Sequence, residues 1–283
     1  MKPLRKYGRS PYTVAVLHGG PGACGDAAPI AKALSSDYGV LEPMQLADSI
    51  SGQIRELELV LKKNTNVPIT LIGYSWGAWL AFIFAAKHPG MVKKLVLVSS
   101  GPFVEEYAKG IERTRLSRLS ENKRTQLDSI STSLSDPKRG SECEILRKFG
   151  ELTSEADTFE PLPKSKAQVT LDYEQHVKIW GEAHRLRKSG ELLELGKKIK
   201  CPVTAIHGDY DSHPAEGVRL PLFSVLKNFQ FILLEKCGHT PWNERYARDQ
   251  FFGVLKIVLQ DYAMDSQKPK LRPEYARKLQ KIR

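Results

Sequence analysis

The sequence predicts an α/β fold, in which a mostly parallel sheet is flanked by helices and interrupted by an inserted helical block. Short apolar runs alternate with helical patterns over the first hundred residues, as expected for strands and helices that build a parallel sheet. A charged, helix-like stretch without a strong strand then follows, and the alternation resumes near residue 200. The sheet domain is therefore expected to be discontinuous in sequence.

The expected elements follow in chain order. Before the insertion, strands are expected at residues 13–17, 39–46, 67–72 and 92–98, and helices at residues 26–34, 50–61 and 76–87. After the insertion, strands are expected at residues 202–206 and 229–234, and a closing helix at residues 242–259. The resulting domains are a core at residues 1–101 and 200–262, a helical insertion at residues 102–199 and a basic tail at residues 263–283.

The net charge of +11 is concentrated at the end of the chain. Residues 266–283 contain seven basic residues and one acid, which leaves a net charge of +5 for the other 265 residues. Tails of this kind are usually solvated, and no recognised DNA- or RNA-binding signature accompanies this one. We therefore do not expect a nucleic-acid partner.

No segment predicts secretion or membrane insertion. The apolar stretch near the N-terminus covers only residues 13–17, which is too short for a signal-peptide core. The longest strongly apolar run, residues 76–86, is too short to cross a bilayer and fits a core helix. Four widely spaced cysteines form no C-x-x-C pair: Cys24, Cys143, Cys201 and Cys237. These features predict a soluble, cytoplasmic protein without a disulfide framework.

The stretch G-Y-S-W-G at residues 73–77 places one serine between two glycines, where an expected strand meets an expected helix. This context matches the nucleophile elbow, a sharp turn that exposes the serine Oγ above a sheet. Glycine is needed at both ends because a Cβ there would collide with the neighbouring strand or helix. The helix N-terminus beside Ser75 favours developing negative charge. Tyr74 and Trp76 are expected to wall the substrate pocket.

A second glycine cluster, H-G-G-P-G at residues 18–22, follows the first expected strand. Beside an elbow, this is the place where an oxyanion hole is completed. We expect the main-chain N–H groups of Gly20 and Trp76 to bind the oxyanion. Glycine at position 20 lets the main chain approach a substrate, and His18 is expected to order the loop.

An activated serine needs a base and an acid that orients the base. His239 is the best candidate for the base, because it follows the strand at residues 229–234 and lies on the same rim as Ser75. Asp211, in the loop after the strand at residues 202–206, is expected to reach His239. Asp209 in the same loop is expected to brace the turn by accepting main-chain hydrogen bonds.

The acid loop also offers a metal-site alternative. His207, Asp209, Asp211 and His213 recur at every second residue and would share one face if the strand continued through them. Gly208 and the Asp-Tyr-Asp-Ser sequence make a continued strand improbable. We therefore expect no metal and no cofactor.

Four motifs resemble the α/β-hydrolase superfamily. They are H-G-G-P-G at residues 18–22, G-Y-S-W-G at 73–77, G-D-Y-D at 208–211 and G-H-T-P-W at 238–242. The order Ser, Asp, His is also that of the superfamily. The resemblance covers about residues 12–101 and 200–260, and it implies the α/β-hydrolase fold with residues 102–199 as a helical cap. Trp242, in the last motif, is then expected to join Tyr74 in the substrate pocket.

The H-G-G-P-G and S-W-G motifs are similar to those of the prolyl iminopeptidase branch, which releases N-terminal proline. That branch usually has glycine where Tyr74 stands, and it grips the substrate amine with acids of the cap. This cap has many glutamates, none of which can be aligned from the sequence: Glu105, Glu106, Glu155 and Glu182 are examples. Little chain precedes the first expected strand, so the hairpin that usually opens the fold is expected to be missing. The sheet is then shorter, or has an edge open to an oligomer.

Together these features predict a serine hydrolase that cleaves a carboxylic ester or amide through Ser75, His239 and Asp211. Its expected partner is a small ester, amide or short peptide, and no membrane is expected. Two alternatives are an aminopeptidase of the proline iminopeptidase type and a non-catalytic ligand-binding protein on the same scaffold, as some relatives are receptors.

Overall fold

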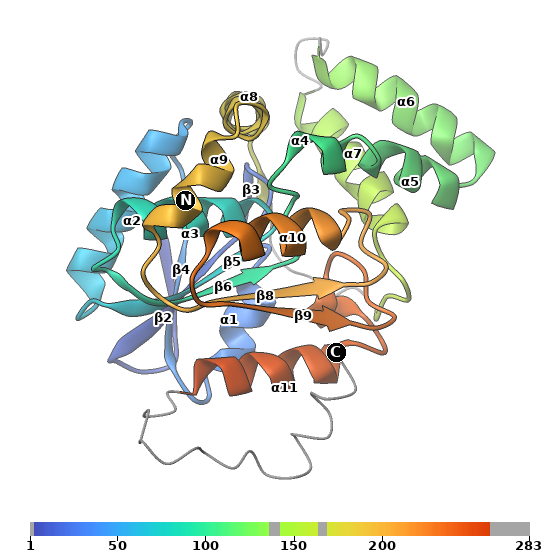
Figure 1. The fold of residues 1–283 in the computed structure, drawn as a ribbon. Coiled ribbons are helices and arrows are strands. Elements are labelled where there is room, and N and C mark those ends of the chain that lie inside the picture. The colour runs from blue at the N-terminus through green and yellow to red at the C-terminus, as the bar shows by residue number, and fades with distance from the viewer. Residues whose placement is uncertain (1–2, 136–141, 164–168, 261–283) are drawn as a thin grey trace.

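The computed structural model describes residues 3–135, 142–163 and 169–260 (Figure 1). The predicted basic tail, residues 263–283, lies outside these ranges. The chain forms one layer of sheet between two layers of helices, with a further group of helices beyond one end of the sheet (Figure 1). The predicted α/β class is confirmed.

The central sheet has seven strands in the order β1-β4-β2-β5-β6-β8-β9. Their bounds are Leu4–Tyr7 (β1), Tyr12–Leu17 (β2), Gly39–Pro43 (β4), Ile69–Tyr74 (β5), Val92–Val98 (β6), Val203–Gly208 (β8) and Phe229–Leu234 (β9). Only β1 runs antiparallel, so the sheet is mostly parallel as predicted. Gly73 near the end of β5 is in register with Leu17 at the end of β2 and with Leu97 of β6. This register brings the loops that follow these strands to one rim.

Helices cover both faces of the sheet, as a parallel sheet requires. One face packs against α1 (Ala28–Leu34) and α11 (Arg248–Leu259), and the other packs against α2 (Ile50–Asn64), α3 (Trp76–Lys87) and α10 (Glu216–Val225) (Figure 1). Helix α3 is buried over almost its whole circumference, which explains why its sequence is apolar without an evident polar face. It contacts β5 and β6, and its apolar side chains belong to the same buried cluster as residues of these two strands.

The insertion between β6 and β8 is mainly helical. Its elements are α4 (Glu105–Ala108), α5 (Ile111–Arg118), α6 (Glu121–Ser135), α7 (Glu142–Ala156), β7 (Thr170–Leu171), α8 (Tyr173–Lys188), α9 (Glu191–Glu194) and the 3₁₀ helix η1 (Leu195–Lys198). A small apolar cluster on α5–α7 is separate from the two clusters on the sheet, and consists of Leu119, Leu127, Leu152 and Ala156. Helix α8 instead packs on the main core through Ile179 and Ala183.

Two short strands tie the insertion to the glycine loop. The pair is β3 (Ala23–Cys24) and β7, which run antiparallel. Strand β7 was not expected, because two residues carry no periodic pattern. The main-chain N–H of Asp172 also donates to Gly22 O (2.9 Å). The insertion therefore contacts the core at the same rim as the ends of the strands.

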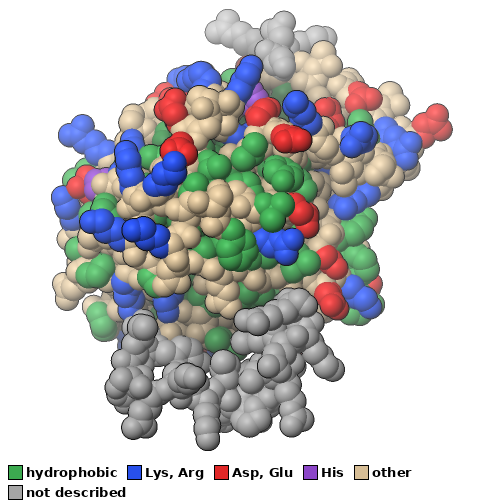
Figure 2. All heavy atoms as spheres, in the orientation of Figure 1, with side chains coloured by type: hydrophobic (Ala, Val, Ile, Leu, Met, Phe, Trp, Pro, Cys, Tyr) green, Lys and Arg blue, Asp and Glu red, His purple; other side chains and the backbone are tan. Residues whose placement is uncertain are grey.

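Three further differences from the expected elements concern β1, α10 and the closing helix. The chain before the first expected strand does contribute a strand, β1, which pairs with β4; Leu-Arg-Lys-Tyr is too short and too charged for its pattern to be recognised. Helix α10 was not expected, because it contains Pro221 and its exposed side chains include the apolar Leu220 and Phe223. Figure 2 shows hydrophobic side chains gathered over the region of this helix.

The third difference concerns the closing helix. It was expected to begin at Trp242, but Pro241–Asn243 form a short 3₁₀ helix (η2), and α11 begins only at Arg248. The loop between them pairs with the insertion instead, since the N–H of Leu162 donates to Asn243 O and that of Arg245 donates to Glu160 O. Within the described parts of the chain, no helix combines the length and the apolar character that crossing a bilayer requires.

Candidate active site

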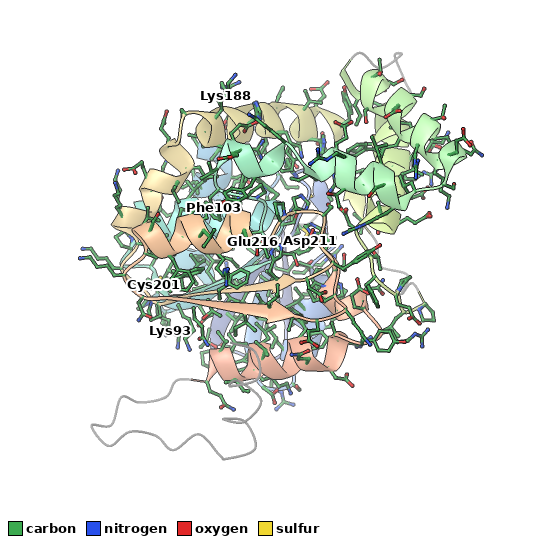
Figure 3. All side chains as sticks on the ribbon, turned by 45° about the vertical axis from the view of Figure 1, so that its right-hand side comes forward. Lys93, Phe103, Lys188, Cys201, Asp211 and Glu216 are labelled. Atoms are coloured by element: carbon green, nitrogen blue, oxygen red, sulfur yellow. The ribbon has the colours of Figure 1, made fainter. Side chains whose placement is uncertain are left out.

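Ser75, Asp211 and His239 meet at the rim formed by the carboxyl ends of the parallel strands. Ser75 follows β5, Asp211 follows β8 and His239 follows β9. His239 Nε2 lies 3.0 Å from Ser75 Oγ, and His239 Nδ1 lies 2.7 Å from Asp211 Oδ2. Asp211 is buried, whereas Ser75 and His239 are partly exposed. In Figure 3, Asp211 lies at the end of β8 that faces the insertion, and Cys201 lies near the opposite end of that strand.

The backbone at Ser75 is strained in the way an elbow requires. Its φ of 52° and ψ of −115° lie in a region that L-residues with a side chain rarely adopt. A Cβ at Gly73 would lie 2.1 Å from Gly77 O, and a Cβ at Gly77 would lie 2.5 Å from His18 O. Only glycine lets β5, α3 and the end of β2 approach this closely, and the hydroxyl is consequently presented above the sheet.

The structure brings Asp211, and not Asp209, to His239. The Asp209 carboxylate accepts a hydrogen bond from the N–H of Cys237 (3.1 Å) and so links its turn to the histidine loop. Gly208 allows this contact, because a Cβ there would lie 2.1 Å from Cys237 O. The two acids therefore have separate places, as the sequence analysis expected from their positions in the loop.

Asp211 and His239 each favour the charged form of the other. Burial alone would raise the pKa of Asp211, but the neighbouring His239 and His213 hold it well below its ordinary value. Burial would lower the pKa of His239, but the Asp211 carboxylate outweighs this and raises it above its ordinary value of 6.5. Asp211 thus stays ionised, and the Nδ1 of His239 carries the proton that it donates to Asp211. Nε2 is then free to accept the Ser75 proton.

A family model of the α/β hydrolase fold matches residues 12–241. The chain belongs to this family. Comparison by sequence with curated proteins gives no match.

Solved structures of α/β hydrolases superimpose on most of the chain. The structure is similar to VinJ (TM-score 0.62, 18% identity, covering 90% of this chain and 93% of VinJ). It is similar to the proline iminopeptidase of Mycobacterium smegmatis (TM-score 0.62, 15% identity, 90% and 93% covered). It is also similar to a bromoperoxidase from Bacillus anthracis (TM-score 0.61, 17% identity, 91% and 95% covered). At sequence identities of 15–18%, these similarities show the fold alone. The named proteins carry out different reactions, so they do not indicate which reaction this chain catalyses.

The glycine loop of this α/β hydrolase is held from three sides. The N–H of Gly19 donates to Asp26 Oδ1 (2.9 Å). His18 is buried, with Nδ1 2.7 Å from Gly19 O and Nε2 2.9 Å from Met44 O. Gly20 has a φ of 102°, and a Cβ there would lie 2.8 Å from Ala23 N, so only glycine fits the turn.

Asp26 is a half-buried acid beside this loop, and the sequence analysis did not single it out. Burial raises its pKa to about 7, against the opposing effect of the hydrogen bond from Gly19. The phenol ring of Tyr74 lies next to the same glycine. In the sequence, Asp26 is recognisable only as an acid four residues after the last glycine of H-G-G-P-G.

The predicted pocket aromatics lie beneath the site. Tyr74 is 7% exposed, lies beside His239 (ring centroids 5.3 Å apart, planes inclined by 48°) and packs edge-on against Trp242, which is also 7% exposed. Trp76 is 1% exposed, and its Nε1 donates to Gln53 Oε1 (3.1 Å). Tyr74 packs against His239 and is itself packed by Trp242, while Trp76 is buried in the core below the elbow. That Tyr74 and Trp242 also contact a substrate stays a prediction.

Sequence reasoning missed a buried link between the insertion and the histidine loop. Glu244 is fully buried, and its carboxylate accepts hydrogen bonds from the N–H groups of Gly238, Phe159 and Glu160 (2.8, 2.9 and 2.9 Å). The N–H of His239 donates to Asp157 O (2.7 Å). No motif marks these residues, because their roles depend on contacts between segments about 80 residues apart.

A second ion pair orders the same link. Arg115 of α5 holds the Asp157 carboxylate through Nε and Nη2, with a shortest distance of 2.6 Å. Burial would raise the pKa of Asp157, but Arg115 holds it below its ordinary value. The loop that carries His239 is therefore fixed by the insertion as well as by β9.

The glutamates considered for amine binding mostly have other partners. Glu105 pairs with Arg187 (2.7 Å), Glu155 pairs with Lys123 (2.6 Å), and Glu182 accepts from the N–H of Ile50 (2.9 Å). Glu106 is exposed. None of these contacts involves a residue of the Ser75 site.

The alternating set considered as a metal site comes together only in part: His207 Nε2 lies 3.6 Å from Asp211 Oδ2 and His213 Nδ1 lies 2.8 Å from Asp211 Oδ1, but Asp209 is not among them. His207 Nε2 lies 2.8 Å from His213 O, and Asp209 faces the histidine loop. Among the described residues, the ligand atoms that come close enough to share a metal belong to Asp211, His213 and His239, which lie within 4.8 Å of one another. The Nδ1 atoms of His213 and His239 already face the Asp211 carboxylate, and Asp211 and His239 are the predicted acid and base.

Proposed function

We propose that this α/β hydrolase is a serine hydrolase that cleaves a carboxylic ester or amide through an acyl-enzyme intermediate. The observation that carries the proposal is the chain of contacts from Ser75 Oγ to His239 Nε2 (3.0 Å) and from His239 Nδ1 to Asp211 Oδ2 (2.7 Å). A hydroxyl, a neutral imidazole and an ionised carboxylate in this order form an activated nucleophile.

In the first half of the reaction, Ser75 Oγ attacks the substrate carbonyl carbon while its proton passes to His239 Nε2. Asp211 stabilises the imidazolium that forms. The negative charge on the carbonyl oxygen is assigned to the N–H groups of Gly20 and Trp76. The N–H of Trp76 suits this role, because it lies at the first position of α3 and has no acceptor within the helix.

Collapse of this intermediate breaks the bond to the alcohol or amine, which leaves with the proton from His239 Nε2. A water molecule then gives a proton to Nε2 while its oxygen attacks the acyl carbon. The second collapse releases the carboxylic acid and returns the proton to Ser75 Oγ. The reaction needs no cofactor beyond these side chains.

We place small acyl esters ahead of peptides with N-terminal proline as substrates. An aminopeptidase of the proline iminopeptidase type needs acids near the site to bind the substrate amine. Glu105, Glu155 and Glu182 pair with residues outside the Ser75 site, and these contacts support placing esters first.

A panel of short-chain acyl esters and of proline- and alanine-terminated amides tests the proposal. We expect hydrolysis of at least one ester by the purified protein, and none by Ser75→Ala. Activity that survives in Ser75→Ala, or that a chelator removes, would contradict it. A wild-type protein that hydrolyses none of the panel and does not react with a fluorophosphonate would instead favour the non-catalytic ligand-binding alternative.

A further inference from the structure

A second histidine shares the carboxylate of Asp211. The N–H and the Nδ1 of His213 lie 3.0 and 2.8 Å from Asp211 Oδ1, while His239 Nδ1 uses the other oxygen, Oδ2. The His213 ring also stacks on the His239 ring, with centroids 4.6 Å apart and planes inclined by 29°. The reaction steps given above do not require His213.

The Asp211 carboxylate determines which ring nitrogens of His213 and His239 carry a proton. An ionised Asp211 can only accept, so both Nδ1 atoms must carry a proton. His213 and His239 are then the same tautomer, placed side by side on the two oxygens of one acid. Among the described residues, three N–H groups donate to this carboxylate and two of them come from residue 213, while His207 Nε2 lies 3.6 Å from Oδ2.

The groups around His213 act on its pKa in both directions, and burial makes their balance a lowered pKa. Burial lowers the pKa of His213, and the nearby charges of His239 and Arg115 act in the same direction, while Asp211 opposes them. The Asp157 carboxylate interacts with both imidazoles from the insertion. His207, at the end of β8, meets the main-chain oxygen of residue 213 and holds the loop.

We propose that His213 is a positioning residue that holds Asp211 with Oδ2 facing His239 and, by sharing the charge of that carboxylate, sets the pH at which His239 accepts the Ser75 proton. This inference rests on the proposed serine-hydrolase function. The two Oδ1 contacts stop the carboxylate from rotating about its Cβ–Cγ bond. The stacked ring also covers one face of His239 and keeps water from Asp211, whose own side chain is fully buried.

Two substitutions separate the hydrogen bond from the ring. In His213→Asn the amide nitrogen stands where Nδ1 stood, since both atoms are bonded to Cγ, so the donor is kept and the ring is lost. In His213→Phe the stacked ring is kept and the donor is lost. His88→Phe is a matched control. His88 follows the C-terminal end of α3, whereas Ser75 precedes the N-terminal end of the same helix, so the two residues are a helix length apart.

The readout is the rate constant for covalent labelling by a fluorophosphonate, measured from pH 5 to pH 9, which needs no known substrate. For His213→Phe we expect the plateau rate to fall roughly tenfold, since misorienting a catalytic group is costly. We expect its acid-side midpoint to rise by about half a unit to one unit, because a carboxylate with fewer donors stabilises the His239 imidazolium more strongly. His213→Asn should stay within about threefold of the wild type with its midpoint unchanged, and His88→Phe should match the wild type.

Equal losses in His213→Asn and His213→Phe without a shift of the midpoint would overturn the positioning role, as would a wild-type profile in His213→Phe. If His213→Phe does not fold, the Nδ1 proton resonance of His239 in His213→Asn and in the wild type decides instead: similar low-field positions support the proposal, and loss of the resonance in His213→Asn contradicts it. Failure of the wild type to label would refute the proposed function itself, and is thus distinguished from failure of this inference.

Discussion

In the proposed mechanism, Ser75 becomes a nucleophile because two residues from distant parts of the chain assist it: His239 takes its proton, and Asp211 orients His239. A serine hydroxyl is weakly nucleophilic by itself, and the imidazole must be neutral, correctly tautomeric and held within hydrogen-bond distance. The structure provides the distance at Nε2 and fixes the tautomer through Asp211. The site chemistry therefore depends most strongly on the two nitrogen atoms of His239.

The tautomer argument predicts unequal effects of the two acids in the loop. Asp211→Asn should lower turnover by around 10⁴-fold, because an amide at that position favours the wrong tautomer of His239. Asp209→Asn should lower it far less, since the Asp209 carboxylate accepts from the main-chain N–H of Cys237 and does not face His239. Steady-state rates on an ester that the wild type hydrolyses provide the measurement. The reverse ranking would mean that Asp209 orients the base.

The raised pKa of His239 predicts the pH dependence of the reaction. His239 works as a base only when neutral. The Asp211 carboxylate raises the pKa of His239 above the ordinary 6.5, so that the imidazole stays protonated to a higher pH. The labelling rate of the wild type should therefore be constant in mildly alkaline buffer and fall as the pH drops through neutrality. Asp211 stays ionised throughout this range. A rate that remains constant down to pH 5 would contradict the assignment of His239 as the base.

At the scale of the elements, the loop after β9 is held by the insertion as well as by the sheet. Glu244 collects three main-chain N–H groups, one from the histidine loop and two from the segment after α7. Buried acceptors of this kind are costly to remove, since each donor left unpaired costs about 1–3 kcal/mol. The insertion thus contributes to the site by fixing the position of His239.

Glu244→Ala should accordingly lower the free energy of unfolding by about 3 kcal/mol. It should also slow the labelling of Ser75, because the His239 loop loses its connection to residues 159 and 160. Urea unfolding and labelling rates measure the two effects. Glu235→Ala, at an exposed position before this loop, is the control and should change stability by less than about 0.5 kcal/mol. Equal stability of the two variants would show that the Glu244 contacts contribute little.

Elements that bury their own apolar residues could be predicted from the sequence, and elements defined by tertiary contacts could not. Residues 76–87, 92–98 and 229–234 have the predicted bounds, because their patterns alone match a core helix and buried strands. Helix α10 interrupts its pattern with Pro221, and the residues after Trp242 form a loop that pairs with the insertion. Patterns within a segment carry no information on such pairings.

The candidate site shows the same division. Ser75, Asp211 and His239 were named from motifs at strand ends, and the parallel sheet brings those ends to one rim. His213, Asp157, Glu244 and Asp26 were not recognised for their roles at the site, because they act through neighbours that only folding supplies. A histidine two residues after Asp211 was visible in the sequence, but it was considered only as part of a metal-site alternative that was not favoured, and no pattern indicated a stacked pair.

At the scale of the whole molecule, the apolar residues form two large clusters on the two faces of the sheet and a small one within the insertion. The small cluster on α5–α7 has four buried residues and is not continuous with the others. Segments with few buried apolar contacts open more readily than core strands. Stability should therefore be unevenly distributed between the sheet and this part of the insertion.

Native-state hydrogen exchange tests that distribution. Amides of β5 and β6 should exchange only through global unfolding, whereas amides of α6 and α7 should exchange through a local opening of lower free energy. The variant Leu152→Ala should accelerate exchange in α6 and α7 and leave β5 and β6 nearly unchanged. Equal protection of the two regions, or equal acceleration by the substitution, would show that insertion and sheet unfold as one unit.

The most direct measurement for the central claim is the mass of the protein after incubation with a fluorophosphonate, with the modified peptide mapped. We predict one adduct on the peptide that contains Ser75 in the wild type, none in Ser75→Ala, and a rate at least a hundredfold lower, to order of magnitude, in His239→Ala. A wild-type protein that remains unmodified, or an adduct at another residue that persists in Ser75→Ala, would contradict the account.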